Sequence, residues 1–318
     1  MGQSRALRGL IVDLVTPLRE SGEIDGRSLG RHLDRILPHV QAVFIASPYA
    51  GEGTLLSAPQ REDLLDKSLV VIRGQMPLLV WVTQNTEEST KETLLLLEKR
   101  LATRRYEGPV FWVDTPLYYH SNRGLFLHYR NLSTLVKEPL ILHNDPELIM
   151  KLGRSFKRNN IRTAILKSVA GIEEIQGLVF LGPLERAGNY QKAVRRRPEF
   201  RIYDGDELHF LKYPSMSGVV SAGANLAPKA WRKITEASLN LTDSRQEYPD
   251  KLQQIWDTGL YLQKLLETYS PFPVPVIKTA LSKMGVVENA EKPVGVENLK
   301  PQLTRIEEAM KAHGDWEN

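Results

Sequence analysis

The residue with the clearest chemical potential in this sequence is a lysine, Lys167, within the segment Arg162–Gly171 (RTAILKSVAG). Apolar residues precede it and small residues follow it, a pattern typical of a buried strand that turns into a helix. A lysine at the buried end of a strand is costly unless its charge is paired or its pKa is lowered. A neutral amine attacks a carbonyl carbon to form a Schiff base. The pattern therefore predicts a nucleophilic lysine, and the segment alone leaves open the alternative of a side chain that extends into solvent.

Other polar groups follow predicted strands elsewhere in the chain. They are Thr16, Ser47–Glu52, Asp114–Tyr119, His143–Asp145 and Asp204–Glu207. In a barrel of parallel strands, chemistry is carried where the strands end, at the carboxyl-terminal face. If these segments and Lys167 share one barrel, hydroxyls, an imidazole and an amine surround a single opening.

Short apolar runs alternate with longer helical patterns and define the elements that would position these groups. The predicted strands are Gly9–Val15, Gln41–Ala46, Pro77–Val82, Pro109–Asp114, Pro139–His143, Ala164–Ser168, Phe200–Tyr203 and Val219–Ala222. Eight strand–helix repeats in this length favour a closed (β/α)8 barrel, an α/β fold, over an open doubly wound sheet. Beyond residue 240 the pattern predicts helices alone, at Gln246–Thr268, Pro275–Met284 and Asn298–His313. We therefore expect a barrel domain over residues 1–240 and a helical region over 241–318.

Composition narrows the classes of function. The 318 residues include no cysteine, which excludes disulfides, thiolate nucleophiles and zinc–thiolate sites. The net charge is +4, and the densest basic run, Arg195–Arg197, lacks interleaved aromatic residues, so we expect a solvated turn and no nucleic-acid partner. No apolar run resembles a signal peptide or a membrane span, so we expect a cytoplasmic protein without membrane contact.

Several motifs occur in an order and spacing that resembles a known family. They are Thr16-Pro17-Leu18, Gly51-Glu52, Arg61-Glu62, Thr115-Pro116-Leu117-Tyr118-Tyr119, Asn144 with Pro146, Ile165-Leu166-Lys167, Asp204-Gly205-Asp206 and Gly218-Val219-Val220-Ser221. The chain thereby resembles the dihydrodipicolinate synthase and N-acetylneuraminate lyase family of lysine-dependent pyruvate aldolases. The resemblance spans residues 9 to about 230.

The resemblance implies roles for particular residues. Lys167 would form a Schiff base with pyruvate or a related 2-keto acid, and no metal or organic cofactor would be needed. His143 stands where the family has a tyrosine that transfers protons, and a histidine can do the same. A tyrosine of the family crosses between subunits and maps onto Tyr118 or Tyr119. A homo-oligomer, a dimer or tetramer, is therefore expected.

The loop after the second strand departs from the family. Where the family reads Gly-Thr-Thr-Gly-Glu, this chain has Pro48-Tyr49-Ala50-Gly51-Glu52. Tyr49 would replace a lost threonine hydroxyl or simply fill the pocket. Backbone amides near Ala50 and Gly51 would still bind the carboxylate of a keto acid.

Further positions bear on the substrate. Leu148 replaces the arginine with which lysine-pathway synthases hold their second substrate, which argues against that reaction. Asp206, Val220 and Ser221 lie where the family lines its pocket; a helix cap and a strand-end hydroxyl are the plainer readings of Asp206 and Ser221. We therefore expect a Schiff-base aldolase or lyase acting on a 2-keto acid. A keto-acid dehydratase using the same lysine, or a barrel that has lost turnover and binds a metabolite or protein, are the alternatives.

Overall fold

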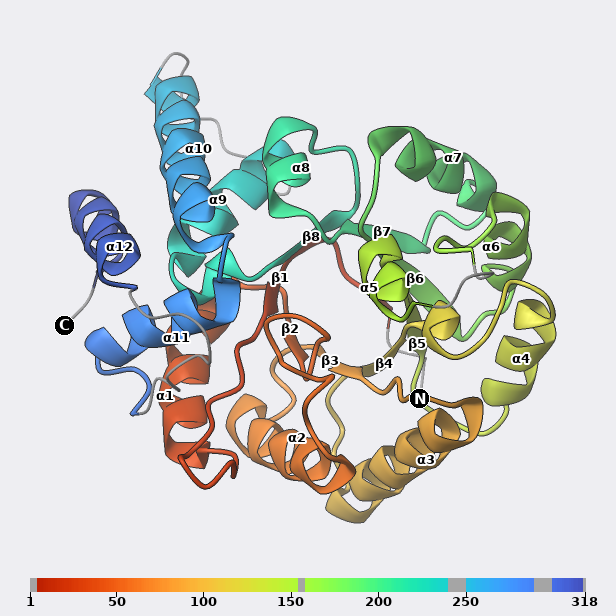
Figure 1. Ribbon diagram of the computed structural model, residues 1–318. Coiled ribbons are helices and arrows are strands. Elements are labelled where there is room, and N and C mark those ends of the chain that lie inside the picture. Colours follow the sequence, from red (N-terminus) through yellow and green to blue (C-terminus); the bar gives the residue numbers. More distant parts are fainter. Residues whose placement is uncertain (1–4, 154–157, 240–249, 289–298, 317–318) are drawn as a thin grey trace.

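Eight parallel strands close into a barrel in the computed structural model, which describes residues 5–153, 158–239, 250–288 and 299–316 (Figure 1). The strands are β1 (Gly9–Asp13), β2 (Ala42–Ile45), β3 (Leu78–Trp81), β4 (Val110–Asp114), β5 (Leu140–Asn144), β6 (Ile175–Phe180), β7 (Arg201–Asp204) and β8 (Gly218–Ser221). Each strand pairs with the next in sequence, and β8 pairs with β1 to complete the circle. The predicted (β/α)8 fold is confirmed.

Helices surround the barrel and follow the strands in alternation. The α-helices are α1 (Gly26–Ile36), α2 (Ala58–Ile72), α3 (Glu87–Arg104), α4 (Leu125–Leu132), α5 (Pro146–Lys151), α6 (Thr163–Val169), α7 (Leu184–Val194), α8 (Glu207–Lys212), α9 (Pro228–Ser238), α10 (Asp250–Tyr269), α11 (Pro273–Lys283) and α12 (Lys300–His313). Short 3-10 turns are η1 (Leu37–His39), η2 (Pro116–Tyr118) and η3 (Gly223–Asn225). Ser57 caps the start of α2, and a reciprocal pair of hydrogen bonds with Gln60 satisfies amides at that helix end.

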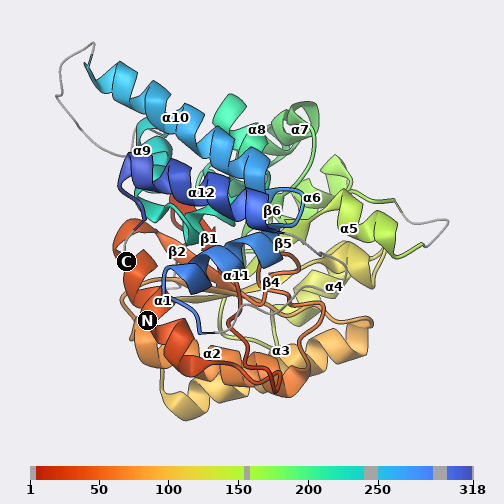
Figure 2. The same ribbon diagram turned by 60° about the vertical axis from the view of Figure 1, so that its left-hand side comes forward.

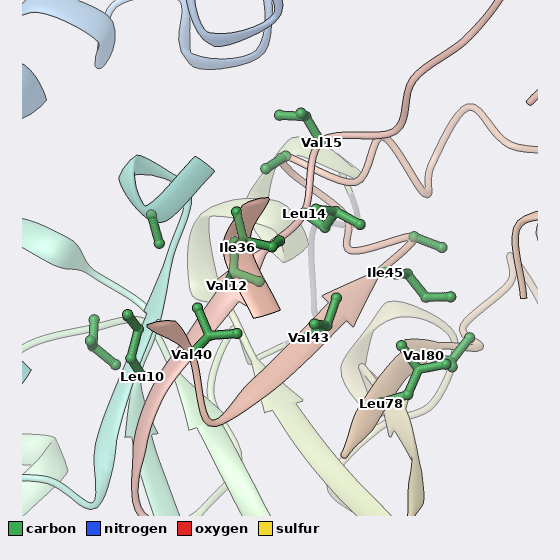
Figure 3. Packing of buried hydrophobic residues seen from close by; sticks show 14 of the residues in the cluster. Leu10, Val12, Leu14, Val15, Ile36, Val40, Val43, Ile45, Leu78 and Val80 are labelled. Atoms are coloured by element: carbon green, nitrogen blue, oxygen red, sulfur yellow. The ribbon is translucent and has the colours of Figure 1, made fainter. Parts of the chain in front are cut away.

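The strands are buried on both faces, so the core has two layers. Side chains that point outward from the strands pack against the helices, and Figure 3 shows part of this layer from β1, β2, β3 and α1. Side chains that point inward fill the barrel itself, among them Phe44, Trp81, Phe111 and Tyr203. The barrel interior is therefore packed by the described side chains.

The sixth strand lies later in the chain than the sequence pattern predicts. Residues 163–169 form helix α6, and the strand is Ile175–Phe180. In α6 only Leu166 and Val169, three positions apart, are buried, which is the spacing of one helix face. The six residues of β6 are all buried, as a central parallel strand requires. The prediction of a strand at Ala164–Ser168 is therefore wrong.

The carboxyl-terminal helices α10, α11 and α12 lie together on one side of the barrel (Figures 1 and 2). Helix α10 packs against α8 and α9, and α12 packs against both α10 and α11. The three predicted terminal helices are therefore present. The expected domain boundary near residue 240 lies outside the described residues. No helix within the described ranges is long and apolar enough to cross a membrane.

Candidate functional site

A cavity of about 780 Å³ opens at the carboxyl-terminal ends of the barrel strands. Its walls come from the loops after the strands and from α10 and α11. Six carboxyl groups line it: Asp13, Glu52, Asp145, Glu147, Asp206 and Glu207. One lysine, Lys278 of α11, is found among the described lining residues, and it forms an ion pair with Glu52. The cavity is therefore strongly acidic.

Lys167, which the sequence places at the end of a strand, lies in α6 on the outside of the barrel. Its side chain is exposed, and it is not among the described residues that line the cavity. The predicted geometry for a Schiff base at Lys167 is wrong because its segment is a helix.

The residues of β6 that could reach the cavity are apolar. Val179 points into the barrel beside His143 of β5 and Tyr203 of β7, and Leu181, just beyond the strand, lines the cavity. Neither side chain can form an imine. Strand six therefore supplies no amine to this cavity.

The loop after β2 has its backbone amides already bonded. The amide of Ala50 donates to the carboxyl group of Asp13, and the amide of Gly51 donates to Ser47 Oγ over 2.8 Å. The amide of Glu52 donates to the carbonyl oxygen of Tyr49 over 3.0 Å. The expected carboxylate site formed by the amides of Ala50 and Gly51 is therefore occupied by the protein's own groups.

Asp13 is a buried acid of the cavity whose pKa is strongly raised. It is 7% exposed, and burial raises its pKa to about 7, against the opposing effect of hydrogen bonds from Ser47 and Ala50. The nearby charge of Glu207 raises the pKa further. Its Oδ1 atom has no hydrogen-bond partner within the part of the chain that the structure describes. Asp13 can therefore hold a proton near neutral pH and present it to a bound molecule.

Tyr49 donates its hydroxyl proton to the carboxylate of Asp145, which also caps α5 by accepting from the amides of Glu147 and Leu148. Burial and the charges of Asp145, Glu147 and Asp13 raise the pKa of Tyr49 far above its ordinary range. The phenol therefore stays protonated and can act only as a donor or as one step of a proton relay. The sequence left open whether Tyr49 offers a hydroxyl or fills space, and it does both.

On the opposite wall, the carboxyl group of Glu207 collects three donors. These are Ser221 Oγ at 2.5 Å, the amide of Gly223 at 2.7 Å and the hydroxyl of Tyr269, from α10, at 2.6 Å. Burial nevertheless raises the pKa of Glu207. Ser221 is thus a support for Glu207 and not a wall of the cavity, whereas Val220 does line it. Asp206 both lines the cavity and caps α8 by accepting from the amide of His209 at 3.0 Å.

His143 and the two predicted tyrosines are not among the described lining residues. His143 is buried inside the barrel, where Thr115 Oγ1 lies 3.0 Å from its Nδ1, and burial lowers its pKa to about 4. Tyr118 packs edge-on against Trp81, with ring centroids 6.1 Å apart. Tyr119 donates to Asp114 Oδ2 over 2.7 Å. Proton transfer by His143 and an intersubunit tyrosine remain predictions.

The sequence pattern missed Asp13 and Lys278 as cavity residues, whereas Glu207 belongs to the segment Asp204–Glu207 that was expected at the opening. Asp13 interrupts an otherwise apolar strand, Gly9–Val15, and a charge in such a run is a signal that could have been used. Lys278 lies in a terminal helix whose contact with the barrel no local pattern encodes.

Comparison with known proteins gives one consistent result. The model of the dihydrodipicolinate synthetase family matches residues 6–312. The 4-hydroxy-tetrahydrodipicolinate synthase of Sodalis glossinidius is 30% identical over 288 residues, which are 88% of this chain and 89% of that protein. The synthase of the same name from Archaeoglobus fulgidus is 26% identical and covers 96% of this chain and 97% of its own. The solved dihydrodipicolinate synthase of Thermotoga maritima superposes with a TM-score of 0.76 at 22% identity, over 97% of this chain and 99% of its own.

Proposed function

This chain belongs to the dihydrodipicolinate synthetase family and is classed with its carbon–carbon lyases, and from this premise we propose that it works by general acid–base catalysis through carboxyl groups of its cavity. The observation that carries the proposal is Asp13, a buried carboxyl with a pKa of about 7 that faces a large cavity. Acids tuned to the working pH are typical of proton-transfer catalysis. No imine from strand six is part of the mechanism, because Val179 and Leu181 occupy its inward positions.

The proposed reaction is the cleavage or formation of a bond beside a carbonyl group. In cleavage, the substrate's β-hydroxyl passes its proton to the oxygen of Tyr49 while Tyr49 passes its own proton to Asp145. The electron pair of that O–H bond forms the new aldehyde, and the carbon–carbon bond breaks toward the carbonyl. Asp13 gives its proton to the carbonyl oxygen, so an enol leaves in place of an unstable enolate. Proton return from Asp145 to Asp13 through solvent restores the site.

The lining favours a substrate without a free carboxylate near Asp13. The amides of Ala50 and Gly51 are already bonded, and a carboxylate there would face several acidic groups in a partly buried space. We therefore propose a neutral or amine-bearing hydroxy ketone in place of the expected 2-keto acid. The related proteins are named 4-hydroxy-tetrahydrodipicolinate synthases, but where the family resemblance implies an arginine for the second substrate this chain has Leu148, which is apolar and buried.

A second candidate is a barrel that binds a small molecule without turning it over. The apolar pair Val179 and Leu181 favours it, because the strand-six position offers no reacting group. A homo-oligomer and a cytoplasmic location remain predictions in either case.

The test is a panel of β-hydroxy carbonyl compounds, read out by aldehyde release through a coupled alcohol dehydrogenase. The panel contains neutral hydroxy ketones, amine-bearing hydroxy ketones and 4-hydroxy-2-keto acids. We expect cleavage of a neutral or amine-bearing compound, and we expect Asp13→Asn to slow it by about 100-fold or more. Lys167→Ala is the matched control and leaves the rate unchanged, because Lys167 lies outside the cavity.

Borohydride reduction in the presence of pyruvate completes the test, with intact-mass measurement as the readout. We expect no covalent adduct. An adduct lost in Lys278→Met would contradict the proposal and assign an imine to the terminal helix. Binding by thermal shift without turnover of any compound would favour the second candidate.

A further inference from the structure

A cluster of metal-binding residue types lies away from the cavity, where α3 meets the segment around α4. Glu87 is the first residue of α3, His120 follows η2, and His128 lies in α4. One ligand atom from each lies within 4.8 Å of the other two. His128 Nδ1 is 3.0 Å from Glu87 Oε1, and His120 Nε2 is 3.8 Å from Glu87 Oε2. The two imidazole rings are stacked, with centroids 5.1 Å apart.

The hydrogen bond of His120 fixes which of its nitrogens carries the proton. His120 Nδ1 lies 2.6 Å from the carbonyl oxygen of Ser121. A carbonyl oxygen only accepts, so Nδ1 must donate. In a neutral imidazole the other nitrogen, Nε2, then carries a lone pair, and that is the atom facing Glu87.

The same reasoning fixes His128. The hydroxyl of Tyr119 donates its proton to Asp114 over 2.7 Å, and burial with the charge of Asp114 holds the pKa of Tyr119 well above its usual range. The oxygen of Tyr119 can therefore only accept from His128 Nε2, which lies 3.0 Å away. Nε2 of His128 carries the proton, and its Nδ1 directs a lone pair at Glu87.

Two lone pairs and a carboxylate thus converge with no proton between them when both rings are neutral. Such an arrangement is repulsive unless both rings take up a second proton or a cation lies between the groups. Each ring also has its outer N–H held by an oxygen, the arrangement that orients histidine ligands around metal ions.

We propose that Glu87, His120 and His128 bind one divalent cation of the zinc type. Two nitrogens and one carboxylate oxygen suit Zn²⁺, and bonds of about 2.0–2.2 Å in a tetrahedron separate ligand atoms by about 3.3 Å. His128 Nδ1 lies 3.0 Å from Glu87 Oε1, close to that value, and His120 Nε2 lies 3.8 Å from the other oxygen of the same carboxylate, Oε2. Three protein ligands leave a fourth position for water, and the half-exposed side chain of Glu87 opens the site to solvent. The ion would tie the start of α3 to α4.

Isothermal titration of the chain with ZnSO₄ tests the proposal, using protein purified without a histidine tag and stripped with a chelator. We expect one Zn²⁺ per chain, and a tetrahedral ligand-field spectrum when Co²⁺ is used instead. Glu87→Gln and His128→Gln each weaken binding by 100-fold or more. Tyr119→Phe removes a hydrogen bond to His128 Nε2, which is not the nitrogen that faces the ion. We expect this variant to weaken zinc binding by about 10- to 100-fold.

Glu88→Gln is the matched control, since Glu88 is the exposed neighbour of Glu87 in the same helix turn, and it leaves the affinity unchanged. Circular dichroism shows that each variant remains folded, and His120→Gln, in a loop, provides a second ligand variant if His128→Gln does not fold. Absence of a Zn²⁺ site, or binding that Glu87→Gln and His120→Gln leave intact, would overturn the proposal. Histidine signals in NMR that titrate to doubly protonated rings and ignore added Zn²⁺ would do the same.

Discussion

The carboxyl group of Asp13 accepts from the amide of Ala50 and from the side chain of Ser47, in the loop expected to hold a substrate's carboxylate. The protein therefore supplies a carboxyl group of its own at that point, which is an anion only above about pH 7. Because this anion is buried, its protonated form is favoured until about pH 7. Asp13 alone therefore affects which substrate charge the cavity accepts and provides a proton that the cavity can donate.

The raised pKa of Asp13 has a measurable effect on stability. The folded state keeps this proton up to about pH 7, whereas the unfolded chain loses it near its ordinary value of 3.8. The stabilisation by Asp13 relative to Asn is therefore complete below about pH 4 and is lost as the pH rises to about 7. We expect the free energy of unfolding of Asp13→Asn to rise relative to that of the wild type across this range, by roughly 4 kcal/mol in total once the pH is above 7.

Urea unfolding at intervals between pH 4 and pH 8 gives this difference. Asp34→Asn, at an exposed acid of α1 away from the cavity, is the control. A constant offset between Asp13→Asn and the wild type at every pH would show that Asp13 titrates normally.

Lys167 shows where reasoning from residues stops. An apolar pair followed by a lysine fits a strand end and a helix face equally well over so short a segment. To distinguish a strand from a helix here, one must know which residues of a whole helical turn are buried. The structure shows that Leu166 and Val169 are the buried residues of α6. Tyr49, Ala50, Asp206 and Val220 were placed at the cavity because their loops are anchored by clear strands on either side.

At the scale of elements, the loop after β2 is held by one buried arginine of α2. Arg61 donates to the carbonyl oxygens of Gly53 and Leu56 in the loop, and of Trp81 and Thr83 at the end of β3. Burial lowers its pKa to about 10, so it remains charged at neutral pH. The loop is also tightly folded, since a Cβ atom at Gly53 would lie 1.9 Å from the carbonyl oxygen of Ala46.

We expect Arg61→Met to lower the free energy of unfolding by about 2–4 kcal/mol, because it leaves buried carbonyl groups without donors. Urea unfolding measures the change, with Arg27→Met, an exposed position, as the control. A loss below about 0.5 kcal/mol would mean that water replaces the guanidinium without cost.

The strand–helix alternation could be predicted because each unit repeats a strong local pattern. The exception, β6, contains a glycine and a glutamine and is preceded by a short helix that has strand-like composition. Tertiary packing, not local preference, decides such a segment.

At the scale of the molecule, the terminal helices complete the cavity. Lys278 of α11 is 2% exposed and pairs with Glu52 of the loop after β2. Removing one partner of this ion pair leaves the other charge buried without the opposite charge that stabilises it. The charge of the cavity is opposite in sign to that of the whole chain: the chain carries a net charge of +4, whereas the cavity is acidic.

We expect Lys278→Met to destabilise the fold by about 3–5 kcal/mol and the double variant Glu52→Gln/Lys278→Met to recover much of that loss. A double-mutant cycle from thermal or urea unfolding gives the coupling. Additive single changes would show that the pair contributes no mutual stabilisation. Lys283→Met, at the exposed end of α11, is the matched control.

Tyr269 and Lys278 attach α10 and α11 to the very carboxylates, Glu207 and Glu52, that a cavity ligand would meet. Occupancy and the docking of these helices are consequently linked in free energy. A bound molecule that leaves both attachments in place would slow amide hydrogen exchange along α10 and α11, and one that displaces them would speed it. Amide exchange in the outermost helices therefore indicates whether a ligand occupies the cavity and whether it displaces these contacts.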